Sequence, residues 1–168
     1  MPSLLLHDSK GKAYTVIQQT YMTTCGPCSI AMVEMMYKKK CATGDPEERA
    51  KSISDWHEGE GMSFGMISAP LTKLSVKYSF TTANDPRKMF SLISPYLSDQ
   101  TPAIVNLVHK GGAMNHIVVC AKIYGDGLGI FLDPAGKIVE VHERSLPAYG
   151  FNQLGRFDFD GSAFMTLR

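Results

Sequence analysis

The stretch TTCGPCSIAMVEMMYKKK, residues 23–40, joins a Cys-x-x-Cys pair to the start of an amphipathic helix. Apolar side chains recur at positions 28, 31, 32, 35 and 36, which is the spacing of a helical stripe. Thr24 is placed to cap this helix, Pro27 falls in its first turn, and lysines close it where the helix dipole is negative. The pattern predicts a helix that begins at Cys25 and leaves open which chemistry a cysteine serves there.

The rest of the chain predicts an α+β fold, with helices in the first half and antiparallel strands in the second. The predicted helices cover residues 44–56, 63–74 and 84–100, and the middle one is weakened by Pro70. Stretches rich in β-branched and aromatic residues predict strands at 102–108, 116–124, 128–133, 137–141 and 162–167. A chain of 168 residues is the size of one domain, so residues 1–168 are expected to form a single domain in which the helical half packs on the sheet.

The composition argues against several classes of function. The net charge is +1, so no broad electrostatic attraction to nucleic acid or to an anionic membrane is expected. No P-loop or dinucleotide-binding motif is present, and no cofactor is expected. The N-terminus has no basic leader, and four cysteines are too few for a disulfide scaffold. We therefore expect a cytoplasmic protein, or one delivered into a target cell without a cleaved signal peptide.

The first interpretation of Cys25 is a thioredoxin-like redox site, because CGPC is the core of that active site. The thioredoxin fold needs a buried apolar strand that ends directly at the first cysteine. Here the nearest strand candidate ends at Ile17, and the residues that follow it are mostly polar. Pro70 has a spacing that would suit the cis-proline of that fold, so the redox interpretation stays open as an alternative.

The second interpretation is a structural zinc site, which usually needs four ligands in two close pairs. Cys41 and Cys120 are isolated in the sequence, and no two histidines have the spacing of a ligand pair. No bound metal is therefore expected.

The third interpretation is a catalytic nucleophile. The unpaired N–H groups at a helix N-terminus favour a thiolate, and the Cys25 N–H can face a developing oxyanion. Gly26 lets a substrate approach the backbone, and Gln19, six residues upstream, can add a neutral side-chain N–H donor. This interpretation explains more residues than the other two.

The general base must come from elsewhere in the chain, and a predicted hairpin selects it. His116 opens one strand, and Asp133 ends the next. A two-residue turn at Gly125-Asp126 would set Val118 opposite Asp133, which leaves His116 one pleat repeat away on the same face. A three-residue turn would break this register. If the turn has two residues, His116 is preferred over the other four histidines.

Each of these residues also has a purely structural explanation. A histidine at the start of a strand is usually structural, and Asp-Pro after a strand is usually a turn. Cys28 and Cys41 are most simply small buried hydrophobic residues. The functional interpretation depends on their joint order: glutamine, Cys-Gly-Pro at a helix start, then histidine and aspartate on paired strands.

This order resembles that of the papain-like cysteine peptidases, and the local sequence is most similar to the C39-like group, the bacteriocin-processing double-glycine peptidases. The matching segments are QQTYMTTCGPCSIAM at 18–32 and NHIVVCAKIYGDGLGIFLDPAG at 115–136. The resemblance implies a papain-like fold with the nucleophile at a helix N-terminus. Two positions depart from the group: Thr24 stands where an acidic residue is frequent, and Cys28 where alanine is common.

The resemblance also implies residue roles and an activity. Cys25 would be the nucleophile, His116 the general base and then acid, and Asp133 its orienter. Gln19 and the Cys25 N–H would form the oxyanion hole. The reaction would be cleavage of a protein or peptide substrate through a thioester acyl-enzyme, with small residues such as Gly-Gly favoured.

The resemblance leaves several biological settings open. Many members of the group are fused to a transporter, whereas this chain carries no such domains, so we expect a free-standing processing peptidase or a bacterial toxin or effector. A toxin would imply an immunity or inhibitor protein as a partner. Deamidation or acyl transfer on side-chain amides, and a pseudoenzyme that binds a partner in the groove, are alternatives within the same fold. A thioredoxin-like redox module is the alternative from a different class of function. Unlike the peptidase, it would require Cys28 as well as Cys25.

Overall fold

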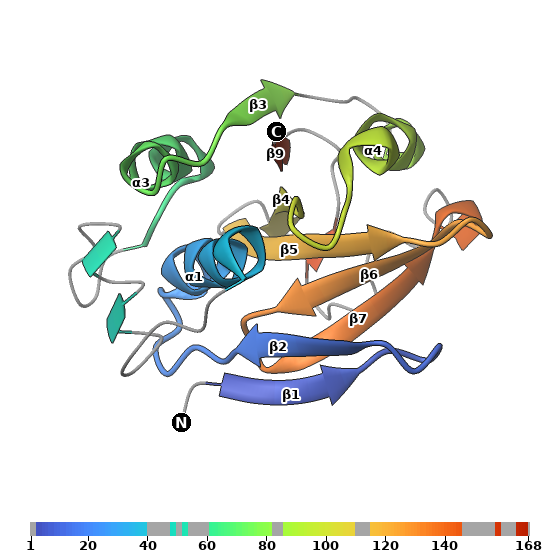
Figure 1. Ribbon diagram of the computed structural model, residues 1–168, viewed down its shortest axis with the longest axis horizontal. Coiled ribbons are helices and arrows are strands. Elements are labelled where there is room, and N and C mark those ends of the chain that lie inside the picture. The colour runs from blue at the N-terminus through green and yellow to red at the C-terminus, as the bar shows by residue number, and fades with distance from the viewer. Residues whose placement is uncertain are drawn as a thin grey trace.

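The computed structural model of the chain describes residues 3–39, 48–49, 52–53, 61–81, 86–109, 115–145, 157–158 and 164–167. Figure 1 shows helices gathered around a central sheet. With η for a 3-10 helix, the elements are β1 (Ser3–His7), β2 (Ala13–Ile17), α1 (Cys25–Lys38), η1 (Phe64–Ile67), α3 (Ser68–Lys73), β3 (Tyr78–Thr81), α4 (Pro86–Ile93), η2 (Ser94–Tyr96), β4 (Ala103–His109), β5 (Asn115–Ile123), β6 (Leu128–Asp133), β7 (Lys137–His142), η3 (Glu143–Ser145), β8 (Phe157–Asp158) and β9 (Phe164–Leu167).

The central sheet is antiparallel throughout. Its strand order is β3-β9-β4-β5-β6-β7, and β8 pairs with β4 beside this path. Strands β1 and β2 pair with each other in a separate hairpin, which contacts β7 and β6 (Figure 1). The strands β5 and β6 therefore lie inside the sheet, with the hairpin on one side of them.

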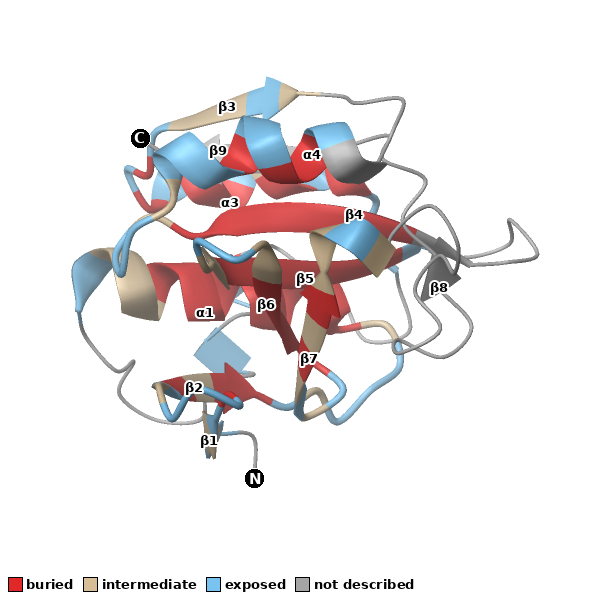
Figure 2. Ribbon diagram, turned by 90° about the vertical axis from the view of Figure 1, so that its right-hand side faces the viewer, coloured by how far each residue is buried: buried red, intermediate tan, exposed pale blue. Residues whose placement is uncertain are grey.

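The two faces of the sheet bury separate apolar cores, because successive residues of a strand point to opposite faces. Ile117 and Val119 of β5 belong to a core shared with α1, β2 and α3. Val118 and Cys120 belong to a second core shared with α4. Figure 2 shows β4 and β5 buried between α1 on one side and α4 on the other. Coverage on both faces explains why β5 reads as a continuous apolar run rather than an alternating one.

Helix α4 approaches β6 closely at Gly129. The rings of Phe90 on α4 and Phe131 on β6 lie 5.9 Å apart between centroids. A Cβ at position 129 would lie 2.8 Å from the Phe90 ring and 2.9 Å from the Phe131 ring. Any side chain at this position would therefore force these two buried rings to shift.

The α+β prediction is confirmed, and the strands predicted in the second half correspond to β4, β5, β6, β7 and β9. The prediction of a mostly helical first half is wrong in part, since β1 and β3 lie there in addition to β2, which is the strand candidate that ends at Ile17. The strand β1 is difficult to recognise in the sequence because its three leucines are consecutive. One of them, Leu5, has 68% of its surface exposed. The alternation of burial along β1 is therefore not matched by an alternation of apolar and polar residues.

The predicted helices are found with changed limits. α1 begins at Cys25 as predicted and ends at Lys38. Pro70 does not interrupt α3, because it lies in the first turn, where a missing N–H is tolerated. Of the helix predicted at 44–56, the structure describes residues 48–49 and 52–53, which are helical. Among the described residues, no helix has the length and hydrophobicity that a membrane crossing requires.

Candidate active site

Cys25 is the first residue of α1, and only 7% of its surface is exposed. The predicted side-chain cap is wrong. Thr24 makes no capping bond to the helix, and its Oγ1 donates instead to the Tyr21 carbonyl at 2.9 Å. A helix leaves its first N–H groups without intrahelical partners, so the positive end of the α1 dipole lies at the cysteine.

His116, at the start of β5, links Cys25 to Asp133. Its Nε2 lies 2.7 Å from Asp133 Oδ1, and a second hydrogen bond joins the ring to the Cys25 side chain. Both His116 and Asp133 are buried. Burial by itself would lower the pKa of His116, but the hydrogen bonds to Asp133 and Cys25 and their negative charges raise it to about 9. At neutral pH the ring is therefore an imidazolium.

The turn after β6 holds Asp133 and Gln19 together. Asp133 Oδ1 also accepts a hydrogen bond from the Ala135 N–H at 2.8 Å. The Pro134 carbonyl accepts one from the Gln19 backbone N–H at 2.8 Å. The Asp-Pro turn thus orients the carboxylate that contacts the histidine and anchors the segment that follows β2.

The strands β5 and β6 pair in the predicted register because two differences from the prediction cancel each other. The hydrogen bond from the Tyr124 N–H to the Leu128 carbonyl closes a turn of three residues, not the two that the prediction assumed. A bulge at Ala121 then shifts the register back by one residue. Beyond the bulge, Val119 pairs with Leu132, which is the pairing that the prediction required.

Gln19 is joined to the turn that follows Asp133 through its backbone, and its side chain is held by the main chain; it is not among the residues that line the groove beside Cys25. Its Nε2 donates to the Tyr21 carbonyl at 2.8 Å. A glutamine amide carries two N–H groups, so one remains for a substrate oxygen. Its Oε1 is buried and has no hydrogen-bond partner in the part of the chain that the structure describes.

A buried hydrogen bond joins α1 to β5 next to the site. Ser29 lies one helical turn after Cys25, and its Oγ donates to the Ile117 carbonyl at 3.0 Å. Ile117 adjoins His116, so this bond fixes the helix that carries the cysteine against the strand that carries the histidine. Ser29 could not be recognised from the sequence, because one serine within an apolar helix has no distinguishing signal.

A groove of about 350 Å³ opens beside Cys25. Met62 packs directly over Gly26: a Cβ at position 26 would lie 2.9 Å from Met62 Sδ and 3.0 Å from Met62 Cβ. The glycine is therefore needed for this contact, which narrows the groove. The sequence analysis also missed most of the lining, because it comes from three separate segments: Met22, Thr23, Cys25, Gly61, Met62, Ser63 and Asn115.

The structure also bears on the competing interpretations of the cysteines. No strand lies between Ile17 and Cys25, so the strand that a thioredoxin site requires is missing. Within the described ranges, no group of three or more His, Cys, Asp or Glu residues is arranged to hold a metal ion. Cys28 and Cys120 are buried and are not joined in disulfides, and Cys41 lies outside the described residues.

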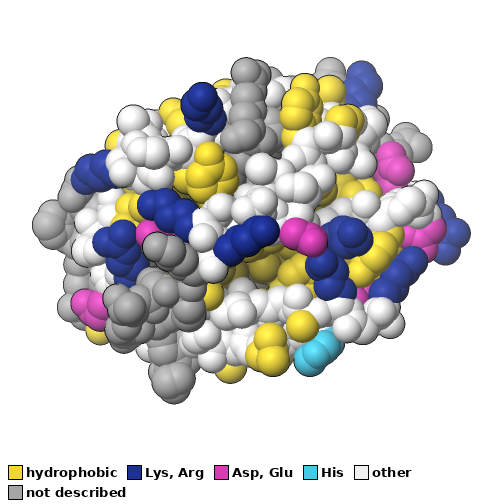
Figure 3. Space-filling model, viewed as in Figure 1, with side chains coloured by type: hydrophobic (Ala, Val, Ile, Leu, Met, Phe, Trp, Pro, Cys, Tyr) yellow, Lys and Arg dark blue, Asp and Glu magenta, His cyan; other side chains and the backbone are white. Residues whose placement is uncertain are grey.

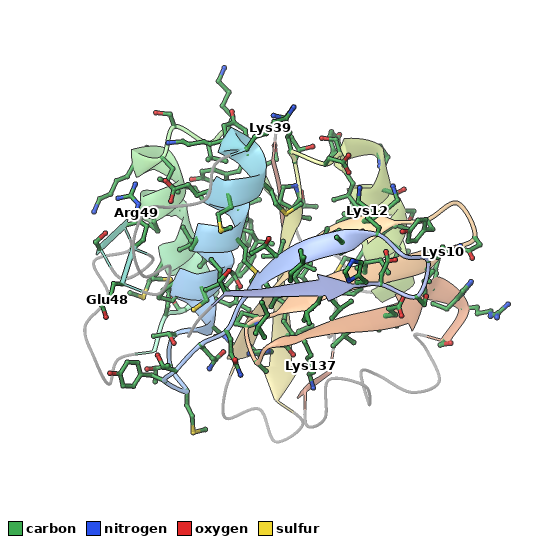
Figure 4. All side chains as sticks on the ribbon, turned by 60° about the horizontal axis from the view of Figure 1, so that its bottom comes forward. Lys10, Lys12, Lys39, Glu48, Arg49 and Lys137 are labelled. Atoms are coloured by element: carbon green, nitrogen blue, oxygen red, sulfur yellow. The ribbon has the colours of Figure 1, made fainter. Side chains whose placement is uncertain are left out.

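A second hollow, of about 450 Å³, is lined by α1 and β2 and is separate from the site. Apolar residues such as Met32 and Met36 line it, together with Lys12 and Asp99, which form an ion pair at 2.9 Å. Figure 3 shows apolar surface surrounded by Lys and Arg side chains on this face. Lys39, another lining residue, lies at the end of α1 opposite to Cys25 (Figure 4).

Comparison with known proteins identifies a family and solved structures to which this chain is similar. The model of the Peptidase_C39 like family matches residues 12–157. The chain is similar to the peptidase domain of Streptococcus ComA, a bifunctional ABC transporter involved in a quorum-sensing pathway, with a TM-score of 0.60 and 17% identity over 92% of this chain and 99% of that chain. It is also similar to a putative C39-like peptidase from Bacillus anthracis, with a TM-score of 0.53 and 15% identity over 91% and 94% of the two chains. A search of curated protein sequences found no match.

The fold is that of the papain-like cysteine peptidases, with a cysteine at the start of a helix that packs on an antiparallel sheet. Because the family model covers most of its length, the chain belongs to the Peptidase_C39 like family and is a cysteine peptidase.

Proposed function

We propose that the protein is an endopeptidase that cleaves a protein or peptide substrate through a thioester acyl-enzyme on Cys25. The observation that carries the proposal is the buried chain of contacts from Cys25 to His116 to Asp133, with 2.7 Å between His116 Nε2 and Asp133 Oδ1. A nucleophile, a base and an orienter of that base are the three groups that this chemistry needs.

In the proposed mechanism, the Cys25 thiolate attacks the scissile carbonyl. The Cys25 N–H and the remaining Gln19 Nε2 hydrogen donate to the oxyanion that forms. His116, protonated at neutral pH, gives its proton to the leaving amine as the tetrahedral intermediate collapses to the thioester. The neutral ring then takes a proton from water, which hydrolyses the thioester. Asp133 keeps the ring oriented throughout.

The substrate part of the proposal is a preference for small residues next to the scissile bond, such as Gly-Gly. The support for it is the packing of Met62 over Gly26, which restricts the space beside the nucleophile. A larger side chain on the substrate would have to displace Met62, which is 8% exposed.

The test compares new protein termini made by the wild type and by Cys25→Ala in a whole proteome. We expect termini after small residues with the wild type and none with the variant. The matched control is Cys120→Ala, which changes a buried thiol in the second core and should leave cleavage intact. Equal cleavage by Cys25→Ala and the wild type would contradict the proposal. Side-chain deamidation without new termini would show instead that the site acts on side-chain amides.

The same experiment separates the biological settings. New termini in proteins of the producing cell would indicate a processing peptidase. New termini only in proteins of another cell would indicate a toxin or effector, for which an inhibitor protein is the expected partner.

A further inference from the structure

The proposed mechanism leaves Cys28 without a role, although it lies three residues after the nucleophile. Both cysteines fall within the first turn of α1, and both belong to the same apolar core. Their accessibility differs, however: Cys25 lines the groove, whereas Cys28 is fully buried. A solute in the groove therefore meets the sulfur of Cys25 first.

The spacing brings the two cysteines to within a small adjustment of disulfide geometry. Residues three apart on a helix have Cβ atoms about 5–6 Å from each other, whereas a disulfide needs roughly 3.5–4.5 Å. Closing this gap requires an adjustment confined to the first turn. That turn has no side-chain cap, and the hydrogen bond that holds its backbone at Cys28 is the one from the Cys28 N–H to the Thr24 carbonyl at 3.0 Å.

The surroundings make one cysteine reactive and the other protected. Cys25 contacts His116, whose proton can neutralise a leaving hydroxide at the sulfur. Cys28 is out of reach of an oxidant in the groove but adjacent to any oxidised form of Cys25. This asymmetry matches the division between an attacked and a resolving cysteine in redox-sensing sites.

We propose that Cys28 is a resolving cysteine, which forms a reversible disulfide with Cys25 when a peroxide oxidises the nucleophile. The proposal rests on the reactive Cys25 of the proposed function and adds a control of that residue. It also gives the CGPC sequence a role that the peptidase mechanism alone does not.

The chemistry balances with hydrogen peroxide as the oxidant. The Cys25 thiolate attacks one peroxide oxygen, so that an S–O bond forms, the O–O bond breaks and hydroxide leaves, taking the His116 proton as water. The Cys28 sulfur then attacks Cys25, so that the S–S bond forms, the S–O bond breaks and a second water leaves with the Cys28 proton. The two thiols lose two electrons, and the peroxide gains them. A dithiol reductant reverses the change by thiol–disulfide exchange.

The consequence is an enzyme that oxidation switches off without damaging it. The disulfide occupies the nucleophile, so cleavage stops. It also prevents further oxidation of Cys25 to sulfinic acid, which is not reversed by ordinary thiols.

The experiment treats the wild type, Cys28→Ala and Cys120→Ala with hydrogen peroxide at neutral pH and maps the products by mass spectrometry. Half of each sample is then reduced with dithiothreitol, and free Cys25 is labelled with iodoacetamide. For the wild type and Cys120→Ala, we expect a Cys25–Cys28 crosslink, a mass lower by two hydrogens, and full recovery of labelling after reduction. For Cys28→Ala we expect two added oxygens on Cys25 and no recovery. Cys120 is a matched control because burial raises its pKa to about 12 and keeps it an inert thiol.

The wild-type sample tests the inference even if Cys28→Ala does not fold, because the crosslink is mapped directly. Absence of that crosslink, or recovery of Cys28→Ala equal to that of the wild type, would overturn the inference. These readouts use no substrate, so they are independent of the proteolysis test. A chain that forms the crosslink but cleaves nothing contradicts only the proposed function, and a chain that cleaves proteins but forms no crosslink contradicts only this inference.

Discussion

His116 is the residue on which the proposed chemistry depends, because it contacts both the nucleophile and the carboxylate. The ring is buried, yet its bonds to Asp133 and Cys25 outweigh burial and raise its pKa to about 9. A raised pKa means that the folded protein binds this proton more tightly than the unfolded chain does, for which the ordinary value is 6.5. In the proposed mechanism, the site therefore starts the reaction with the proton that the leaving amine needs.

A first prediction concerns pH. The protonated His116 should stabilise the fold fully below pH 6.5, and this contribution should disappear as the pH rises through about 9. One pKa unit corresponds to about 1.4 kcal/mol, so the free energy of unfolding should lose at most roughly 3.5 kcal/mol from this source. Urea unfolding of the wild type and His116→Gln at pH 6 and pH 10 measures it.

The control for this measurement is His7→Gln, at an exposed position of β1. It should keep the pH dependence of the wild type, whereas His116→Gln should lose it.

The rate of peptide cleavage by the wild type should also fall on the alkaline side with an apparent pKa of about 9. Stability that changes equally with pH in His116→Gln and the wild type would contradict the assignment.

At the level of elements, the site is formed where α1 meets β5. Neither element holds the site alone, since Cys25 comes from the helix and His116 from the strand. The bond from Ser29 Oγ to the Ile117 carbonyl, 3.0 Å long and buried, connects them within one turn of the cysteine. The distance between nucleophile and base therefore depends on how firmly these two elements are held together.

A second prediction follows for Ser29→Ala. Loss of one buried hydrogen bond should lower the free energy of unfolding by about 1 kcal/mol. If Ser29 positions α1, the rate of Cys25 alkylation at neutral pH and kcat should also fall, with KM little changed. The matched control is Ser91→Ala, which removes a similar bond from Ser91 Oγ to the Lys88 carbonyl on the exposed face of α4. An alkylation rate equal to that of the wild type would leave Ser29 with a stabilising role only.

At the scale of the whole molecule, Asp8 ties the N-terminal hairpin across the sheet. Its Oδ2 accepts hydrogen bonds from the hydroxyls of Tyr124 at 2.6 Å and Tyr14 at 3.3 Å. Lys10 and Lys12 lie at the far end of the hairpin (Figure 4), and Lys10 Nζ pairs with a residue of the β5–β6 turn at 2.9 Å. Because β2 leads to Gln19, the docking of this hairpin also sets the segment that reaches the site.

A third prediction follows for Asp8→Ala. The variant would leave two tyrosine hydroxyls without their acceptor, which should lower the free energy of unfolding by about 1–3 kcal/mol. The control is Lys10→Ala, which breaks an exposed ion pair and should cost less than about 1 kcal/mol. Urea unfolding followed by circular dichroism measures both. Equal destabilisation by the two variants would show that the Asp8 contacts do not hold the hairpin.

Much of the candidate site can be predicted from the sequence, because its residues stand beside strong local signals. Cys25 begins a helix marked by its apolar spacing, and His116 and Asp133 lie at the ends of two apolar strands. Local hydrogen bonding and hydrophobic periodicity determine such elements, and both are properties of neighbouring residues. The pairing of β5 with β6 was predicted on the assumption of a shorter turn, and the bulge at Ala121 compensated for the difference.

The sequence by itself determined the helix start at Cys25, the run of strands after it, and the order of the four candidate residues. Only the tertiary structure decided that Ser29 bonds to β5, that Pro134 holds Gln19, and that Met62 packs over Gly26. These contacts join residues that are 36 or more positions apart, and each depends on the close packing of whole elements rather than on any local preference. Spacing along the chain therefore selects the reacting groups, and packing sets the distances between them.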